Sequence, residues 1–430
     1  MITPRLAWLD ALRGWAAVVV AAFHVSPLVL GTGRHLRIFE IIDLGKYGVL
    51  LFFLVSGYVI PMSLERHGDL RRFWTGRLLR IYPAYLFAVL VTIGLGAAGI
   101  MRMPAQLAGE TTASVLGHVT MLQDLIGTRG VLRPFWTLSF EMVFYLMVAG
   151  LFAWSRHHDS ARRRHHDSAG RRHHDSAGRR EHDSAGRRRR DSAWWAAGLT
   201  IVAVCGLPDD LLGATAANRR ITAVAALVLL GCVLGAYRIG RRPLTLAAGL
   251  AGIGAVTLPL LNGHATDQVT SASSGQATQM LAVMFAGTVV HRTQQGHLGR
   301  LPAVAVLTLV TVGVAVQVSP TVAVAVVATF AIAFLLRHRR VPGVLVRLGA
   351  VSYSLYLLHI PVLAVIRHHT QQPLLTLVAF AAGSLTAAWA GHRWVERPAQ
   401  ALARRAPVTA GVKAGTGTTD RVPVRVGRIL

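Results

Sequence analysis

The chain has 430 residues, of which 53% are hydrophobic and only 15% are charged, and its mean hydropathy is +0.47. A soluble domain carries about 25% charged residues. The apolar residues here gather in blocks of about 17 to 25, the length that crosses a bilayer. The composition therefore excludes an ordinary soluble protein and predicts an all-α, polytopic transmembrane helical bundle.

The formal net charge of +26 would suit a nucleic-acid partner if the chain were soluble. Its arginines instead stand in short clusters between apolar blocks, which is typical of cytoplasmic loops, and no nucleic-acid-binding module is visible. We therefore expect no nucleic-acid partner. Cys205 and Cys232 each lie inside an apolar block, which argues against a disulfide framework, and we expect no metal site.

The apolar blocks follow one another along nearly the whole chain. They run at 15–30, 47–62, 82–100, 135–154, 193–207, 221–237, 243–261, 278–291, 301–317, 320–336, 347–367 and 373–394. Because some later blocks are short, we expect about ten to twelve spans. The first block follows Arg5 and Arg13, as a signal peptide would, but it lacks a small-residue cleavage site and contains His24. We interpret it as a retained span.

The basic loops predict a topology. The arginine-rich segments are 64–80, 155–192, 238–242, 337–347 and the stretch from Arg393 onward. If the spans alternate, all of them fall on one side, which the positive-inside rule makes cytoplasmic. The opposite side receives 31–46, 101–134, 208–220, 262–277 and 367–372. We therefore expect both termini in the cytoplasm, in a multi-pass protein of the plasma membrane that contacts lipid.

We divide the chain into four regions. They are an N-terminal transmembrane half (1–154), a repeat loop (155–192), a C-terminal transmembrane half (193–398) and a basic tail (399–430). The loop repeats eight residues close to Arg-Arg-His-His-Asp-Ser-Ala-Gly. Eight residues at about 100° each leave a drift of about 80°, so the repeat builds no constant helix face. We expect a solvated cytoplasmic loop rather than a His-rich metal site, and a disordered tail.

Ionisable side chains inside spans are costly and are therefore functional candidates. Arg13 and His24 are eleven positions apart in the first span. Eleven helical steps make three turns and about 20°, so both residues share a face, with a rise of about 16 Å between them. An anion at Arg13 could extend an arm of the length of pantetheine to His24. Alternatively, Arg13 pairs with Asp10 and His24 only packs between helices.

A second basic element is Arg77-Leu-Leu-Arg80-Ile-Tyr-Pro83. At positions i and i+3 the two guanidinium groups share a helix face. Such a pair suits bidentate recognition of phosphate. The alternative is that both arginines only anchor the cytoplasmic end of the span.

Two later spans add polar groups at a similar depth. Glu141 follows Trp136 and Ser139, which share a face, and lies about 10 Å from the outer end of its span. His359, in a span that runs outward, also falls in the outer half. His24, Glu141 and His359 thus lie at comparable depth, which is necessary for them to form one site.

Six short motifs carry a resemblance. They are Leu9-Asp10-Ala11-Leu12-Arg13-Gly14 with His24, Phe52-Phe53-Leu54-Val55-Ser56-Gly57-Tyr58, Arg77-Leu-Leu-Arg80-Ile-Tyr-Pro83, Trp136-Thr-Leu-Ser-Phe-Glu141 with Phe144-Tyr145, Ser352-Tyr-Ser-Leu-Tyr-Leu-Leu-His359, and Glu396-Arg397-Pro398. In this order, over residues 6 to 398, the chain resembles the acyltransferase 3 family of membrane acyltransferases. Each motif alone is weak, and the six in order are specific. The long repeat and the number of apolar blocks depart from the family, whose core has about ten spans.

The resemblance implies transfer of an acyl group, commonly acetyl from acetyl-CoA, to a hydroxyl at or beyond the outer membrane face. Typical acceptors are surface glycans and glycosylated secondary metabolites. The family's essential Arg and His correspond to Arg13 and His24, and its Arg-x-x-Arg pair to Arg77 and Arg80. We expect no permanently bound cofactor, with acyl-CoA as the donor substrate.

Together these arguments assign roles. Arg13, Arg77 and Arg80 hold the phosphates of acyl-CoA, His24 removes the proton of the acceptor hydroxyl, and Glu141 orients or stabilises His24. Four residues are candidates for acceptor binding: His359, Tyr356, Trp136 and Ser139. An acyl-histidine intermediate stays open. The rival class is a proton-coupled transporter or flippase, which inverted repeats would favour, and we find none between the halves.

Overall fold

The structure is a computed structural model that describes all residues except 1–5, 105–106, 108, 170–210, 264–273 and 406–430. All secondary-structure elements in this described part are helical. Most of the predicted repeat loop, most of the basic tail and the predicted span at 193–207 lie outside the described residues. The boundaries of the four predicted regions therefore stay predictions.

Nine helices of the described part are long and apolar enough to cross a membrane. They are α1 (Ala7–Leu30), α3 (Leu44–His67), α4 (Leu70–Ala97), α7 (Trp136–Ala169), α9 (Ala216–Ile239), α13 (Arg300–Gln317), α14 (Pro320–Leu335), α15 (Gly343–His369) and α16 (Pro373–Gly391). This confirms the predicted all-α, polytopic bundle.

Two further runs lie alongside these helices. The helix α12 (Ser274–Gln294) packs against α3, and α10 (Arg242–Gly254) packs against α7 and α9. The run of α10 is broken by η4 (Ala255–Thr257) before α11 (Pro259–Asn262). Pro259 has no N–H to continue the α-helical ladder, which explains a break at this point.

Shorter helices connect the long ones. They are α2 (Thr32–Ile41), α6 (Thr111–Thr120), η2 (Asp124–Ile126), η3 (Arg133–Phe135), η5 (Leu336–His338), the π-helical turn η6 (His392–Glu396) and α17 (Arg397–Arg405). Two of the elements enter regions that we expected to be irregular. The helix α7 continues through the first repeats to Ala169, and α17 covers the start of the predicted tail. Alanine and arginine are good helix formers, so both helices extend past their spans.

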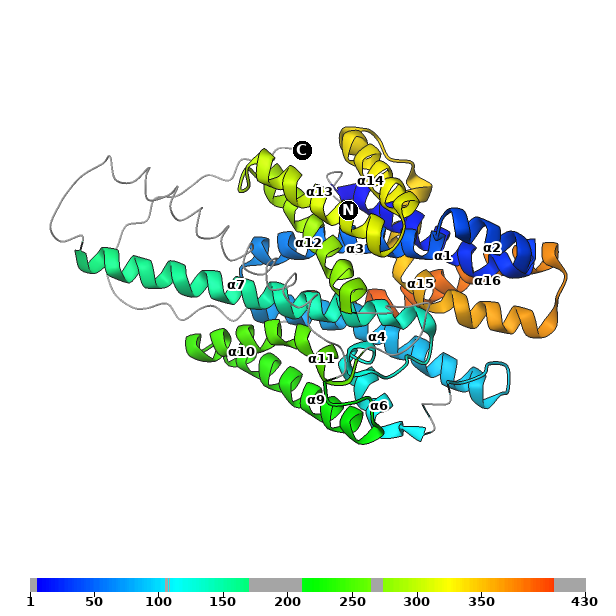
Figure 1. The fold of residues 1–430 in the computed structure, drawn as a ribbon, viewed down its shortest axis with the longest axis horizontal. Coiled ribbons are helices and arrows are strands. Elements are labelled where there is room, and N and C mark those ends of the chain that lie inside the picture. Colours follow the sequence, from blue (N-terminus) through cyan, green and yellow to red (C-terminus); the bar gives the residue numbers. More distant parts are fainter. Residues whose placement is uncertain (1–5, 105–106, 108, 170–210, 264–273, 406–430) are drawn as a thin grey trace.

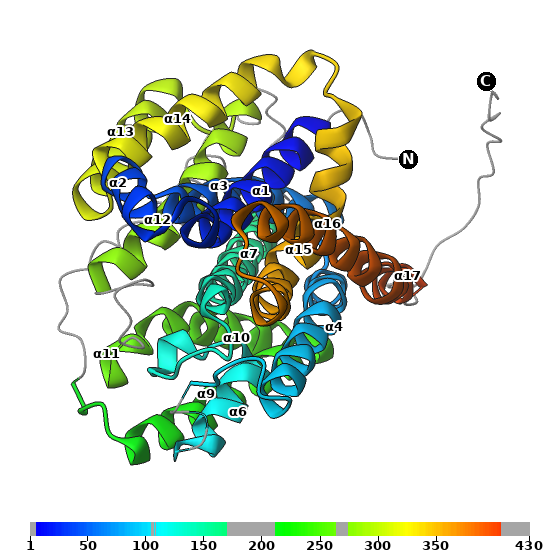
Figure 2. The ribbon, with the colours of Figure 1, turned by 90° about the vertical axis from the view of Figure 1, so that its right-hand side faces the viewer.

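Several long helices, such as α3 and α7, run along the long axis of the molecule, whereas α13 and α14 are tilted from it (Figure 1). Seen end-on, α7 and α15 lie near the centre of the bundle, whereas α13 and α14 lie at one edge and α9 at the opposite edge (Figure 2). The burial of side chains agrees, because α7 is the most enclosed of the candidate spans and α13 the least. Polar groups on the central helices are therefore shielded from lipid.

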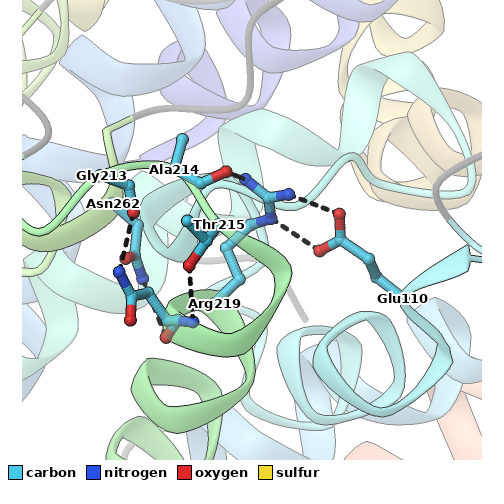
Figure 3. A network of polar contacts seen from close by, with 7 residues as sticks. Glu110, Gly213, Ala214, Thr215, Arg219 and Asn262 are labelled. Carbon is cyan, nitrogen blue, oxygen red and sulfur yellow. Dashed lines mark hydrogen bonds and ion pairs between the residues drawn. The ribbon is translucent and has the colours of Figure 1, made fainter.

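A network of polar contacts joins Glu110, the start of α9 and the end of α11 (Figure 3). Arg219 at the start of α9 donates two hydrogen bonds to the Glu110 carboxylate, one of them 2.6 Å long from Nε. Asn262 at the end of α11 donates to Thr222 Oγ1 at 2.6 Å and to the carbonyl oxygen of Asn218 at 3.4 Å. These contacts unite parts of 101–134, 208–220 and 262–277, as expected if all three lie on one side of the membrane. The pKa of the Glu110 carboxyl is lowered mainly by the hydrogen bond from Arg219.

Candidate active site

Two adjoining pockets lie inside the bundle between α1, α3, α7 and α15. Both are lined by Arg13, Ser56, Glu141 and Tyr353. The first, which also reaches α4, holds about 390 Å³ of space, counting the space at its opening. The second lies nearer the start of α3 and holds about 450 Å³ on the same measure. We call them the arginine pocket and the aromatic pocket.

Three guanidinium groups line the arginine pocket, from Arg13, Arg77 and Arg80. The structure thus brings together the three residues that the sequence predicted for phosphate binding. Arg77 is buried, and its guanidinium carbon lies 5.6 Å and 5.5 Å from the ring centres of Phe73 and Tyr145. These cation–π contacts hold the side chain in place at the wall of the pocket.

Arg13 and Arg80 make no hydrogen bond or salt bridge to any residue that the structure describes. In particular, the alternative ion pair between Arg13 and Asp10 does not form. Guanidinium groups that are desolvated and lack acceptors favour an anion with several oxygens between them. One carboxylate, that of Glu141, faces three positive charges in this pocket, so the pocket carries a surplus of positive charge.

Glu141 lies at the junction of the two pockets, where its carboxylate accepts a hydrogen bond from the Tyr145 hydroxyl. We expected Glu141 to orient His24, but the structure does not join the two residues. In the described part of the chain no hydrogen bond links Glu141 to His24. The carboxylate instead belongs to the arginine pocket.

His359, rather than Glu141, is in contact with His24. Its Nε2 lies 3.2 Å from Nδ1 of His24, and the two ring centres are 5.0 Å apart. His24 is half-buried, whereas His359 is fully enclosed. The structure therefore unites two of the three ionisable groups that the sequence placed at equal depth, and it places the third one separately.

The aromatic pocket adjoins the arginine pocket and approaches the histidine pair through Tyr356, although neither histidine lines it. It is lined by Val49, Phe52, Phe53, Thr137, Leu138 and Tyr356, together with the residues shared with the arginine pocket. The Tyr356 hydroxyl donates to the carbonyl oxygen of Pro134 at 2.9 Å, and its ring centre lies 6.0 Å from that of His359. Tyr356 thus lines the aromatic pocket and also lies beside His359, which fits its predicted role in substrate contact.

The other two candidates for acceptor binding, Trp136 and Ser139, line neither of these two pockets. Trp136 is buried against Phe53 and Phe140. Ser139 is fully buried, and its hydroxyl oxygen accepts a hydrogen bond of 3.3 Å from the backbone N–H of Asp124. Both residues therefore pack the helix α7 rather than face the pocket. Spacing of i and i+3 shows that two side chains share a face but not what lies opposite that face.

The sequence analysis gave no role to several residues that matter here. Tyr353 and Ser56 line both pockets, and each lies inside a motif that carried the family resemblance. Glu396, from the last motif, is buried and accepts hydrogen bonds from the Ser354 hydroxyl and from His392 Nδ1, the latter at 3.0 Å. This carboxylate ties the π-helical turn after α16 to α15.

These features define a multi-pass helical membrane protein with a cationic internal pocket and a pair of contacting histidines in the same bundle. A family model, the acyltransferase domain of the acyltransferase 3 type, matches residues 6–393. The chain belongs to this family.

Similar proteins of known name come from bacteria. The chain is 28% identical to acyltransferase MdmB of Streptomyces mycarofaciens over 152 residues, which is 33% of this chain and 38% of MdmB. It is 27% identical to O-acetyltransferase OatA of Staphylococcus aureus over 161 residues, 34% of this chain and 25% of OatA. It is 26% identical to the putative peptidoglycan O-acetyltransferase YrhL of Bacillus subtilis over 153 residues, 32% of this chain and 22% of YrhL.

The matched segments thus span well under half the length of these relatives. No solved structure matches the chain.

Proposed function

We propose that this protein transfers an acyl group, commonly acetyl, from acyl-CoA to a hydroxyl group of a carbohydrate or a glycosylated secondary metabolite at the outer membrane face. The observation that supports the proposal best is the order of groups inside the bundle. Three guanidinium groups line the arginine pocket, Tyr356 lines the adjoining aromatic pocket, and the ring of Tyr356 lies 6.0 Å from that of His359, which contacts His24.

The donor fits this order. The phosphates of CoA would lie among Arg13, Arg77 and Arg80, where the positive charge is in surplus. The pantetheine arm would then extend through the aromatic pocket past Phe52 and Tyr356. Arg13 and His24 are separated by about 16 Å of helical rise, which such an arm can cover. The thioester would thus reach the histidine pair while the nucleotide stays at the arginines.

His24 supplies the base in this proposal. The acceptor oxygen attacks the thioester carbonyl carbon, a C–O bond forms and the C–S bond breaks. His24 takes the hydroxyl proton and passes it to the leaving thiolate, so the products are an ester and CoA with a free thiol. A covalent acyl-histidine is the alternative route, and mass spectrometry of quenched protein distinguishes the two. Glu141 would balance part of the charge of the arginine pocket.

The acceptor class is suggested by the relatives. Two of them are O-acetyltransferases by name, and the name of one specifies peptidoglycan. A hydroxyl of a glycan or a glycosylated metabolite is the acceptor that we propose. The transporter reading needs no thioester donor, so the donor decides between the two classes.

The test uses membranes that contain the full chain and radiolabelled acetyl-CoA. We expect CoA release and label in surface glycans or secreted metabolites, and the loss of both in His24→Ala, with normal insertion. The matched control is His368→Ala, because His368 is exposed at the end of α15. Labelled acceptor that persists in His24→Ala would refute the role of His24, and wild-type membranes that release no CoA would refute the donor.

A further inference from the structure

The hydrogen bonds of His359 fix which of its ring nitrogens carries the proton. Nδ1 lies 2.8 Å from the carbonyl oxygen of Tyr356 and 3.2 Å from that of Leu355. A carbonyl oxygen only accepts hydrogen bonds, so Nδ1 carries the hydrogen. In the neutral ring, Nε2 is then left with a lone pair, and it is Nε2 that faces His24.

The same argument applies to His24. Its Nδ1 lies 2.8 Å from the carbonyl oxygen of Val20, so Nδ1 carries a hydrogen. That hydrogen is shared between the Val20 oxygen and the lone pair of His359 Nε2. The second ring nitrogen of His24 keeps its lone pair, and no residue that the structure describes hydrogen-bonds to it. The available base in the pair is therefore Nε2 of His24.

We infer that His359 is a positioning residue for His24, which it holds through a hydrogen bond from His24 Nδ1–H to His359 Nε2. This inference rests on the proposed function and assigns His359 a role other than acceptor binding. His359 is 0% exposed, so it does not reach a substrate directly.

The hydrogen bond between His24 and His359 explains how the ring of His24 is held and stabilised. The Val20 oxygen already accepts the backbone hydrogen bond of the helix. It therefore has to accept a second hydrogen bond in order to hold the ring of His24. His359 adds a dedicated acceptor on a second helix, which fixes the orientation of the ring and stabilises the imidazolium that forms when Nε2 takes a proton. A carboxylate does this in the serine hydrolase triad. A neutral imidazole does it here without placing a second formal charge inside the membrane.

Kinetics of two substitutions test the role. His359→Leu keeps the bulk but removes the acceptor, and we expect kcat for CoA release from acetyl-CoA to fall about 100-fold with KM for acetyl-CoA within about 3-fold. His359→Gln offers an amide oxygen near the position of Nε2, and we expect it to restore kcat to within about 10-fold of the wild type. His368→Leu, on the exposed end of the same helix, should change neither constant. Equal losses in the Leu and Gln variants, or a change confined to KM for the acceptor, would overturn the inference.

A chemical measurement tests the geometry without turnover. Diethyl pyrocarbonate modifies an accessible unprotonated imidazole nitrogen, and peptide mass spectrometry locates the product. In the full-length wild type we expect modification of His24 and protection of His359. Modification of His359 at the rate of His24 would show that His359 is accessible and would refute the positioning role. This result is independent of the proposed donor, because a protein that fails to use acetyl-CoA still reports which histidine is free.

Discussion

A β-carbon on Gly349 would lie 2.1 Å from the carbonyl oxygen of Asp10, so α15 packs directly against the backbone of α1 and leaves no room for a side chain there. Across the same contact, a β-carbon on Gly14 would lie 2.7 Å from the backbone nitrogen of Gly349. Small residues permit such close packing inside membranes. Gly14 and Gly349 each precede the histidine of their own helix by ten residues, which is about 15 Å of helical rise. Their contact therefore sets the separation of the two helices that carry His24 and His359.

The close contact predicts an effect on activity. Gly349→Ala should push α15 away from α1 and lower the acyl-transfer rate about 100-fold, because a shift of about 1 Å in reacting groups costs that much. Gly343→Ala, on the same helix, is the control, since nothing lies within 4 Å of a β-carbon there. Rates are compared at equal amounts of membrane-inserted protein. A Gly349→Ala variant as active as Gly343→Ala would show that the spacing of α1 and α15 does not control the histidine pair.

The arginine pocket predicts a defect in donor binding. Arg80→Lys keeps the charge but loses the planar fork, so we expect the KM for acetyl-CoA to rise about 10-fold. Arg77→Lys should have a similar or larger effect, because it also loses contacts with Phe73 and Tyr145. Arg72→Lys is the control on the exposed part of the same helix. If donor KM stays unchanged in both pocket variants, the arginines serve as membrane anchors only.

The helices were predictable from the sequence, whereas the rotation of each helix about its axis was not. Hydropathy and length identify a span, and a span that is apolar on most sides carries little period-3.6 signal to show its inward face. Polar residues supplied that signal for Arg13, Arg77 and Arg80, which do meet in one pocket. For Ser139 the polar side chain was not a guide to the pocket, because its hydroxyl oxygen accepts a hydrogen bond from the buried backbone N–H of Asp124. The partner of His24 could not be predicted, because equal depth in the membrane does not show which two of three groups are in contact.

A buried histidine in α6 predicts a dependence of stability on pH. His118 Nε2 accepts a hydrogen bond of 3.0 Å from the Val131 N–H, and Nδ1 donates to the Ser114 oxygen at 2.7 Å. Burial lowers the pKa of His118 below the ordinary histidine value of 6.5. Below this value the unfolded chain binds a proton that the folded chain does not, so stability is complete above about pH 7 and falls as the solution is acidified.

Thermal unfolding at pH 7.5 and pH 5.5 measures this contribution of His118. His118→Gln keeps an acceptor for Val131 and does not titrate, so its loss of Tm on acidification should be smaller than that of the wild type by about 2 °C. His368→Gln is the matched control and should behave as the wild type. Equal losses in all three proteins would exclude His118 as a source of the pH dependence.

The last prediction concerns sidedness, because the proposed reaction takes a donor from the cytoplasm and modifies an acceptor outside. Thr112 in α6 and Arg72 near the start of α4 are both exposed, and the positive-inside rule places them on opposite sides. In a background with Cys205→Ser and Cys232→Ser, Thr112→Cys should react with an impermeant maleimide in intact cells. Arg72→Cys should react only after lysis, and denatured protein gives full labelling as the control. The reverse pattern would place the arginine pocket toward the outside. Acyl-CoA in the cytoplasm could then not reach the arginines, and the proposed reaction would be excluded.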